Sequence, residues 1–349
     1  MTYDWNEISK NWLLEVQVSY PREQCVSAFN TVERLLGSEW IDRYSRGARG
    51  YPIALLIIEL GKILELIANI SKANSIINRM KALDSFPSAW SEAQFLSQLI
   101  LRKLDVRIGP RIRVAHSMKQ PDFEAIADGS SVYIEVSCPI ASDEQRRIMK
   151  GFNWAREAIL DITPRGTRVE AYLYREPNMG DWHTIINLIK QMISNSVTQC
   201  KIDGLVQLFV NAVEIESLST FENGILEKRP ILVLAEGRIE DGISKCLSLK
   251  IPFSDERAQQ TLNREARQFY KAFSNLMVLD LSLIPGGIGA WESLVSRRLQ
   301  PNLNRRIGAI LLTRSTLSLN GLNHEERLIM HPAPYLPLPD CFLSRIRQC

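Results

Sequence analysis

The sequence predicts an α/β fold with a helical N-terminal region, and three observations support this. Residues 1–84 place apolar side chains at helical spacing and carry few strand signals. From Val106 the spacing changes to alternation of apolar and mostly polar residues, which is typical of strands. Farther along, segments of helical and strand pattern alternate, which is the order of elements in an α/β or α+β domain. The pairing order of the strands does not follow from these patterns.

Length and composition set the number of domains and the class of protein. With 349 residues the chain is long enough for about two domains. Apolar residues make up 45% and charged residues 23%, as in ordinary globular proteins, which argues against a disordered or fibrous chain. We expect a helical N-terminal region over 1–88 and an α/β domain over 89–349. A linker is expected over 85–88, because Pro87 disfavours helix at the residue before it.

The most apolar stretch, 52–70, is predicted to be a buried helix. Pro52 suits its first turn, because proline is tolerated there without an amide hydrogen. Glu59, Lys62 and Glu65 lie near the middle, where a membrane span rarely carries charges. No apolar signal segment opens the chain, so we expect a cytoplasmic protein without a membrane anchor, whose six cysteines are reduced.

The remaining elements follow in order along the chain. A helix is expected from about residue 89 to Leu104, with Ser88 or Ser91 as its N-cap. We then expect strands over 106–114, 123–127, 132–138, 168–174, 205–215, 230–235, 276–283 and 307–313, and helices over 142–161, 181–198 and 254–273. About the last 25 residues are rich in proline, and we expect them to be irregular.

A β-hairpin is predicted around Asp128-Gly129, because this dipeptide between two alternating segments is a strong turn signal. A two-residue turn would place Asp122 directly opposite Glu135, whereas a four-residue loop would place Glu124 opposite Glu135. Both registers give the hairpin one polar and one apolar face. The polar face carries Asp122, Glu124, Tyr133, Glu135 and Ser137, and the apolar face, which should pack on the core, carries Phe123, Ala125, Ala127, Val132, Ile134 and Val136.

Carboxylates that face one another across a hairpin repel and cost stability unless something neutralises them. A divalent cation does so, and Mg²⁺ takes oxygen ligands, uses few carboxylates and keeps bound waters. Such a site can bind a phosphodiester oxygen, lower the pKa of an attacking water and steady the leaving group. The polar face of the hairpin therefore predicts a site for Mg²⁺ or Mn²⁺.

The hairpin and its surroundings resemble the PD-(D/E)XK nuclease superfamily, which has the restriction-endonuclease-like fold. The matching segments are Pro121-Asp122, the hairpin, Glu135-Val136-Ser137 and the upstream helix that carries Glu92, all within residues 91–175. The resemblance implies a core made of a mixed sheet flanked by helices. It also implies a metal site formed by Glu92, Asp122, Glu135 and the carbonyl oxygen of Val136, in an Mg²⁺-dependent endonuclease that hydrolyses DNA. A role in bacterial restriction or defence fits such a protein.

The chain departs from the family pattern at Ser137, which occupies the position of the motif lysine. In the family that lysine orients the attacking water and stabilises charge, and a serine cannot supply a positive charge. Substitutes are available at Lys119, at Arg146, Arg147 and Lys150 on the helix after the hairpin, and at Arg264, Arg267 and Gln268 farther along. We favour the helix after the hairpin and expect Lys150 to act in catalysis beside Asp122 and Glu135, with Ser137 at the same site.

Basic residues gather locally, although the net charge is only +3. The clusters are Arg102, Lys103, Arg107, Arg111 and Arg113 before the hairpin, Arg146, Arg147, Lys150 and Arg156 after it, and Arg297, Arg298, Arg305 and Arg306 near the C-terminus. Such clusters bind phosphates without reading sequence. We expect Arg111, Arg113, Arg146 and Arg147 to contact nucleic acid, in the first place DNA. We expect the N-terminal helices to mediate self-association or to bind a protein partner.

Two alternatives stay open. The first is an inactive module of the same fold, which binds nucleic acid or a protein partner without cleavage. Ser137 favours this alternative, whereas the three acids argue against it, because carboxylates without a metal repel phosphate. The second is an unrelated α/β enzyme in which the hairpin is coincidental, and no other catalytic grouping in the sequence supports it.

Overall fold

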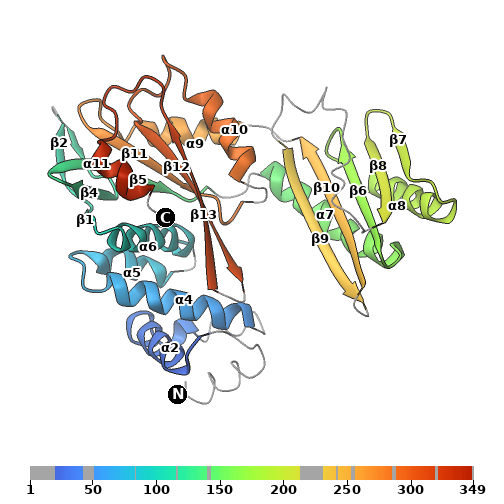
Figure 1. Cartoon of the computed structure of the whole chain (residues 1–349), viewed down its shortest axis with the longest axis horizontal. Helices are drawn as coiled ribbons and strands as arrows, with labels where there is room; N and C mark the ends of the chain where they lie inside the picture. Colours follow the sequence, from blue (N-terminus) through green and yellow to red (C-terminus); the bar gives the residue numbers. More distant parts are fainter. Residues whose placement is uncertain are drawn as a thin grey trace. The chain divides into compact units, whose positions relative to one another are not determined.

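The structure, a computed structural model, describes residues 20–41, 51–82, 84–114, 117–139, 143–212, 231–240, 243–252, 256–284, 288–318 and 321–347. The chain forms two compact units, which are both drawn in Figure 1. The first combines Met1–Pro139, Thr261–Ser282 and Ser296–Cys349, and the second combines Ile140–Gln260 and Leu283–Val295. This division differs from the expected boundary at residue 88, because the described N-terminal helices belong to the same unit as the hairpin. The predicted helical residues before residue 20 lie outside the described part.

The first unit is built on a mixed six-stranded sheet in the order β1-β4-β5-β11-β12-β13. Its strands are β1 (Asp105–Ile108), β4 (Phe123–Ala127), β5 (Ser130–Ser137), β11 (Ser274–Asp280), β12 (Ala309–Ser318) and β13 (Gly321–Met330). Neighbours β5, β11 and β12 run parallel, and the other pairs are antiparallel. A short separate hairpin of β2 (Ile112–Val114) and β3 (Ser117–Lys119) follows β1. The mixed sheet expected from the sequence is confirmed.

The described helices of the N-terminal region are α2 (Arg22–Leu36), α4 (Tyr51–Ile67), α5 (Ala73–Met80) and α6 (Phe86–Leu101). Helix α6 packs on β1 and β5, and α4 packs on α2, β12 and β13 (Figure 1). Gly61 allows α2 and α4 to approach closely, because a Cβ there would lie 2.4 Å from the carbonyl oxygen of Ala28. No helix among the described residues is long and apolar enough to cross a membrane.

The predicted hairpin forms with the two-residue turn. Asp128 and Gly129 have φ angles of 47° and 80°, as the type I′ turn requires, and Phe123 pairs with Ile134. This register is the one that sets Asp122 opposite Glu135. The apolar face is buried as expected, with exposures of 8% or less at Phe123, Ala125, Ala127, Val132, Ile134 and Val136.

The core does not continue over residues 140–175, where the sequence predicted its next helix and strand. The parallel neighbour of β5 is β11, and the helix that precedes β11 is α9 (Glu256–Ala266). The elements directly after the hairpin, α7 (Asp143–Ile162) and β6 (Thr167–Leu173), pack within the second unit. The chain between the hairpin and α9 is therefore an insertion that carries most of the second unit.

The C-terminal segment is more regular than its prolines suggested. Strand β13 pairs with β12 over its whole length, and α11 (Asp340–Ile346) ends the described chain. Helix α11 buries Phe342, Leu343 and Ile346 in the core that α6 and the hairpin share. This burial explains why a short helix is stable after a proline-rich stretch.

The second unit has a five-stranded sheet in the order β7-β8-β6-β10-β9. Its remaining strands are β7 (Gln199–Ile202), β8 (Val206–Ala212), β9 (Ile231–Glu240) and β10 (Ile243–Pro252), and its helix α8 (Met179–Ser194) packs on α7 and β8. Helix α8 begins with a capping box between Asn178 and Asp181. The sequence predicted β6, β8 and the start of β9 but missed β7 and β10. Helix α10 (Ile288–Arg298) was also missed.

Candidate metal centre

Asp122 and Glu135 meet at the end of the hairpin that is opposite the turn. Asp122 stands just before β4, where its backbone carbonyl accepts a hydrogen bond of 2.8 Å from the Gly109 amide. Its Oδ2 atom accepts a second bond of 2.8 Å from the backbone N–H of Val136. This amide lies beyond Phe123–Ile134, the last paired residues of β4 and β5, so the Asp122 side chain satisfies it. The side chains of Asp122 and Glu135 are hydrogen-bonded to each other.

The raised pKa values of both carboxyls favour a proton shared between them, because burial penalises two negative charges in contact. Burial and, after it, the neighbouring charge of Asp122 together raise the pKa of Glu135 to about 9. Burial also raises the pKa of Asp122 to about 6, with a second contribution from the charge of Glu92. At neutral pH the pair therefore carries about one negative charge in place of two.

Glu92 lies on α6 and is 4% exposed. Both of its carboxylate oxygens accept hydrogen bonds from the guanidinium of Arg79 on α5, one of them at 2.8 Å. The charge of Glu92 raises the pKa of Asp122, and the charge of Arg79 lowers it. Arg79 is a functional candidate that the sequence did not indicate, since nothing in the local pattern pairs the end of α5 with α6.

Glu265 on α9 is a further acid of this cluster, and the sequence gave no reason to select it. It is 7% exposed, and its charge contributes to the raised pKa of Glu135. Arg264 holds one oxygen at 2.6 Å, and the Gln268 amide donates to the other at 3.0 Å. Arg264 and Gln268, two of the candidate substitutes for the motif lysine, both bind Glu265 in the structure.

Ser137 ends β5 and is 7% exposed, beside Leu279 of β11 in the parallel register. Lys119, one candidate substitute for the motif lysine, donates to the backbone carbonyl of Arg267 at 3.2 Å. Lys150, the favoured one, lies on α7 in the second unit and is exposed. Lys150 therefore belongs to a different compact unit from the acids, and its expected role in catalysis stays a prediction.

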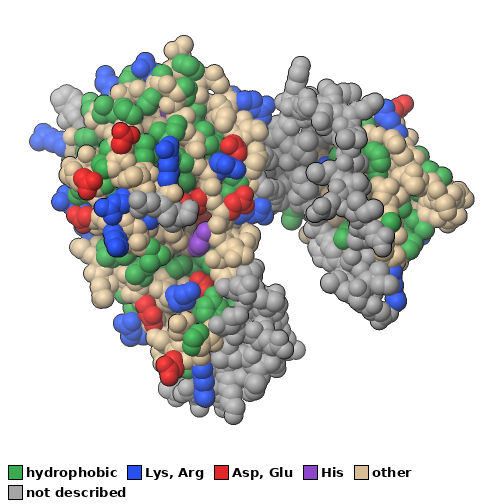
Figure 2. Space-filling view, in the orientation of Figure 1, with side chains coloured by type: hydrophobic (Ala, Val, Ile, Leu, Met, Phe, Trp, Pro, Cys, Tyr) green, Lys and Arg blue, Asp and Glu red, His purple; other side chains and the backbone are tan. Residues whose placement is uncertain are grey.

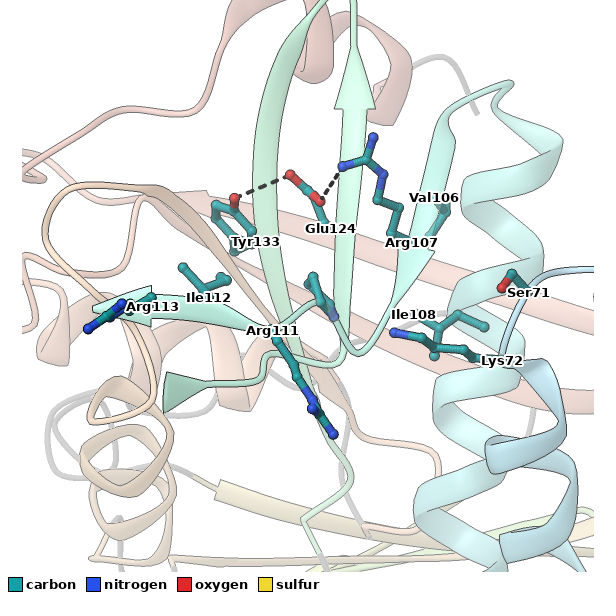
Figure 3. A pocket seen from close by; sticks show the side chains of 11 residues that line it. Ser71, Lys72, Val106, Arg107, Ile108, Arg111, Ile112, Arg113, Glu124 and Tyr133 are labelled. Carbon is teal, nitrogen blue, oxygen red and sulfur yellow. Dashed lines mark hydrogen bonds and ion pairs between the residues drawn. The ribbon is translucent and has the colours of Figure 1, made fainter. Parts of the chain in front are cut away.

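The predicted nucleic-acid contacts separate into two sets. Arg111 and Arg113 line a cavity of the first unit together with Lys72 and Arg107 (Figure 3). Arg146 and Arg147 lie on α7 of the second unit, where Arg147 forms an ion pair of 3.1 Å with Glu176. On the face drawn in Figure 2, basic side chains of the first unit are interspersed with acidic ones. This mixture of basic and acidic side chains agrees with the small net charge of the chain.

The C-terminal basic cluster also forms part of a cavity in the first unit. Arg305 and Arg306 line a space of about 390 Å³ together with Arg267 and three asparagines. The Arg305 guanidinium stacks 4.6 Å from the ring centre of Tyr335 and donates to the Ala333 carbonyl at 3.0 Å. These contacts fix Arg305 in place at the edge of the cavity.

The donor chemistry of the acid pair fits a hard divalent cation. Asp122 and Glu135 provide carboxylate oxygens, and a cation can take the place of the proton that they share. Glu92 fits less well as a direct ligand, because both of its oxygens already bind Arg79. Within the described ranges, no group of three or more His, Cys, Asp or Glu side chains is already arranged around a metal position. Asp122 and Glu135 are therefore the residues that would hold the ion.

The chain matches no family model, no curated protein and no solved structure. The buried acids and their partners are therefore the basis on which a function is assigned.

The shared proton predicts how stability depends on pH without metal. Between about pH 5 and 9 the folded pair binds more protons than the unfolded chain, because both carboxyls have raised pKa values. The free energy of unfolding should therefore fall as the pH rises through this range. The Glu135→Gln variant should lose most of this slope and melt several degrees higher than wild type at pH 8.5.

Thermal melts in EDTA at pH 5.5, 7.0 and 8.5 measure this effect. Glu325→Gln, an exposed change on β13, serves as the control and should follow wild type. Melting temperatures that change with pH in the same way in wild type and in Glu135→Gln would contradict the shared proton.

Proposed function

We propose that the protein is a metal-dependent nuclease that hydrolyses phosphodiester bonds, in the first place in DNA. The observation that carries the proposal is the buried pair Asp122–Glu135, which holds one proton and provides oxygen ligands. A buried acid pair costs stability, and such pairs with raised pKa values gather at functional sites. The antiparallel hairpin with a parallel neighbour, β11, supports a restriction-endonuclease-like core for this site.

In this proposal Asp122, Glu135 and the carbonyl oxygen of Val136 hold Mg²⁺ or Mn²⁺. The bound ion would lower the pKa of an attacking water and neutralise charge on the phosphate. The Val136 amide fixes one oxygen of Asp122, which leaves the other oxygen and the Glu135 carboxylate as ligands. Glu92 does not bind the ion directly in this proposal. It positions Arg79 beside Asp122.

Positive charge in place of the motif lysine comes from two guanidinium groups in this proposal. Arg79 binds Glu92 and lowers the pKa of Asp122, so the positive charge of Arg79 acts on the acid pair. Arg264 binds Glu265, whose charge acts on Glu135. Both arginines belong to the compact unit of the acids, and α9 is the helix that leads into the parallel strand beside β5.

The test is cleavage by the purified full chain with Mg²⁺, with Mn²⁺ and with EDTA. Supercoiled plasmid, single-stranded DNA and RNA are the substrates, and products are separated on gels. We expect cutting of DNA with either metal and none in EDTA. Cutting that persists in EDTA, or no cutting by folded protein with metal present, would contradict the nuclease.

A module that binds nucleic acid without cleavage is the second candidate, and two observations favour it. Ser137 lacks the charge of the motif lysine, and the shared proton reduces the repulsion between the acid pair and a phosphate. Such a module would bind DNA equally well in EDTA and in Mg²⁺ and would leave it intact. A filter-binding assay beside the cleavage assay separates the two functions.

A further inference from the structure

A cavity of about 590 Å³ lies on the first unit beside the polar face of the hairpin. Figure 3 shows Glu124 of β4 and Tyr133 of β5 at its centre, Arg107 of β1 on one side, and Arg111 and Arg113 of the β2 segment on the other. Its volume falls within the range of about 300–1,000 Å³ that is usual for small-ligand sites. The cavity is therefore large enough for one nucleotide.

The rim of the cavity is strongly basic. It carries Lys72, Arg107, Arg111 and Arg113, against a single acid, Glu124. Among the described residues no acid pairs with Arg111 or Arg113, and both side chains are exposed. The Lys72 ammonium donates a long hydrogen bond of 3.4 Å to the Gly109 carbonyl. Guanidinium groups bind phosphate oxygens in a bidentate manner, so this rim suits a phosphate ester.

The interior of the cavity does not suit a phosphate alone. Glu124 is 7% exposed, accepts a hydrogen bond of 3.2 Å from the Tyr133 hydroxyl, and lies 3.4 Å from an Arg107 nitrogen. A carboxylate repels phosphate. Tyr133 and Arg107 each contact a different oxygen of Glu124 at more than 3 Å, so each oxygen keeps a lone pair that can accept an N–H donor from the edge of a nucleobase. Val106, Ile108 and Ile112 also contribute to the lining, although Val106 and Ile108 pair with Ala125 and Phe123 of the core-facing side of the sheet. The Tyr133 ring makes an edge contact with the Phe273 ring, with 4.8 Å between the ring centres.

We propose that this cavity binds a single unpaired nucleotide of a nucleic-acid strand, with its phosphates on the arginines and the edge of its base on Glu124. Guanine presents two adjacent N–H donors to a carboxylate, whereas thymine presents one, so guanine is the preferred base. Binding of a nucleotide in this cavity does not depend on the proposed nuclease activity.

The position of the cavity gives it a role in the proposed nuclease, and this part rests on that function. Glu124 is two residues from Asp122, and Tyr133 is two residues from Glu135, all on one face of the hairpin. Two residues span about 7 Å along a strand, so a nucleotide in the cavity would adjoin the acid pair. The preferred substrate is then single-stranded nucleic acid, or the end of a duplex at which the bases are unpaired.

The test measures binding in EDTA, so that its outcome does not depend on cleavage. Isothermal titration of the full chain uses dGMP, dTMP and inorganic phosphate, and fluorescence anisotropy uses labelled oligo(dT) with and without one central guanine. We expect dGMP to bind about ten-fold more tightly than dTMP or phosphate, and the guanine-containing strand to bind more tightly than oligo(dT).

Three variants locate the binding. Arg111→Gln should weaken binding of every nucleotide about ten-fold, Glu124→Gln should remove the preference for guanine, and Arg34→Gln on α2 should change neither. Arg111 and Arg34 are both exposed, so their replacement leaves the fold intact. Equal binding of dGMP and phosphate, or binding unchanged by Arg111→Gln, would overturn the site. Binding of dGMP without binding of the guanine-containing strand would overturn the assignment to a strand.

Discussion

Replacing Asp122 with asparagine or Glu135 with glutamine should reduce metal-dependent cleavage at least about 100-fold, because each change removes a charged oxygen ligand. Each replacement keeps the size of the side chain, and asparagine can still accept the bond from the Val136 amide. An amide in place of either carboxyl also prevents two negative charges from meeting within the pair. Both variants should therefore be folded and at least as stable as wild type at neutral pH. Initial rates on plasmid DNA with Mg²⁺ measure the effect.

Asp105→Asn is the matched control for these two variants. Asp105 is an exposed carboxylate on β1 in the same sheet, so its loss should leave the cleavage rate within about two-fold of wild type. Full activity in either Asp122→Asn or Glu135→Gln would show that the acid pair does not hold the catalytic metal. It would also point to a contaminating nuclease or to a different site.

Gly61→Ala should destabilise the first unit by about 2 kcal/mol, although alanine favours helices over glycine by about 1 kcal/mol. The added Cβ would lie 2.4 Å and 2.5 Å from the carbonyl oxygen and Cα of Ala28. These are backbone atoms, so α2 and α4 have to separate and lose close packing. The melting temperature should fall by about 4–8 °C, as measured by circular dichroism.

Gly289→Ala supplies the matched comparison. Gly289 also lies in a helix, α10, but an added Cβ there would meet no described atom within 4 Å. This variant should melt at or slightly above the temperature of wild type. If Gly61→Ala were as stable as Gly289→Ala, the close approach of α2 and α4 would be wrong.

The hairpin was predictable because its determinants are local. The Asp128-Gly129 turn selects the two-residue connection, and the alternation of apolar residues then decides which side chains face the core. Together they place both acids on one face in either register, and the pairing in the structure decides that Asp122 lies opposite Glu135. The apolar pattern of 52–70 likewise sufficed for α4, since helical spacing is also a local property.

The continuation of the core was not predictable, because it depends on a distant segment. Strand β11 pairs with β5 across the insertion of the second unit, and no pattern near the hairpin indicates such a partner. For this reason the sequence favoured the next helix, α7, as the source of a cation. The contact of Arg79 with Glu92 likewise appears only once α5 and α6 are packed, and the effect of Glu265 on Glu135 depends on where α9 lies in the fold.

Two elements near the C-terminus were missed for a different reason. Strand β13 is an edge strand, and its exposed side chains include Asn323, Glu325 and Arg327, so it lacks a continuous apolar run. Helix α11 has only seven residues and follows several prolines. Its stability comes from burial in the core, and sequence propensity does not report on that burial.

Binding of Mn²⁺ to the purified full chain, followed by electron paramagnetic resonance at pH 6 and pH 8, tests the metal centre most directly. The account predicts that wild type removes the signal of free Mn²⁺, more strongly at pH 8 because the shared proton has to leave. Glu135→Gln should leave the free signal at the level of buffer. Equal Mn²⁺ binding by wild type and Glu135→Gln, or no binding by wild type at pH 8, would contradict the acid pair as a metal centre.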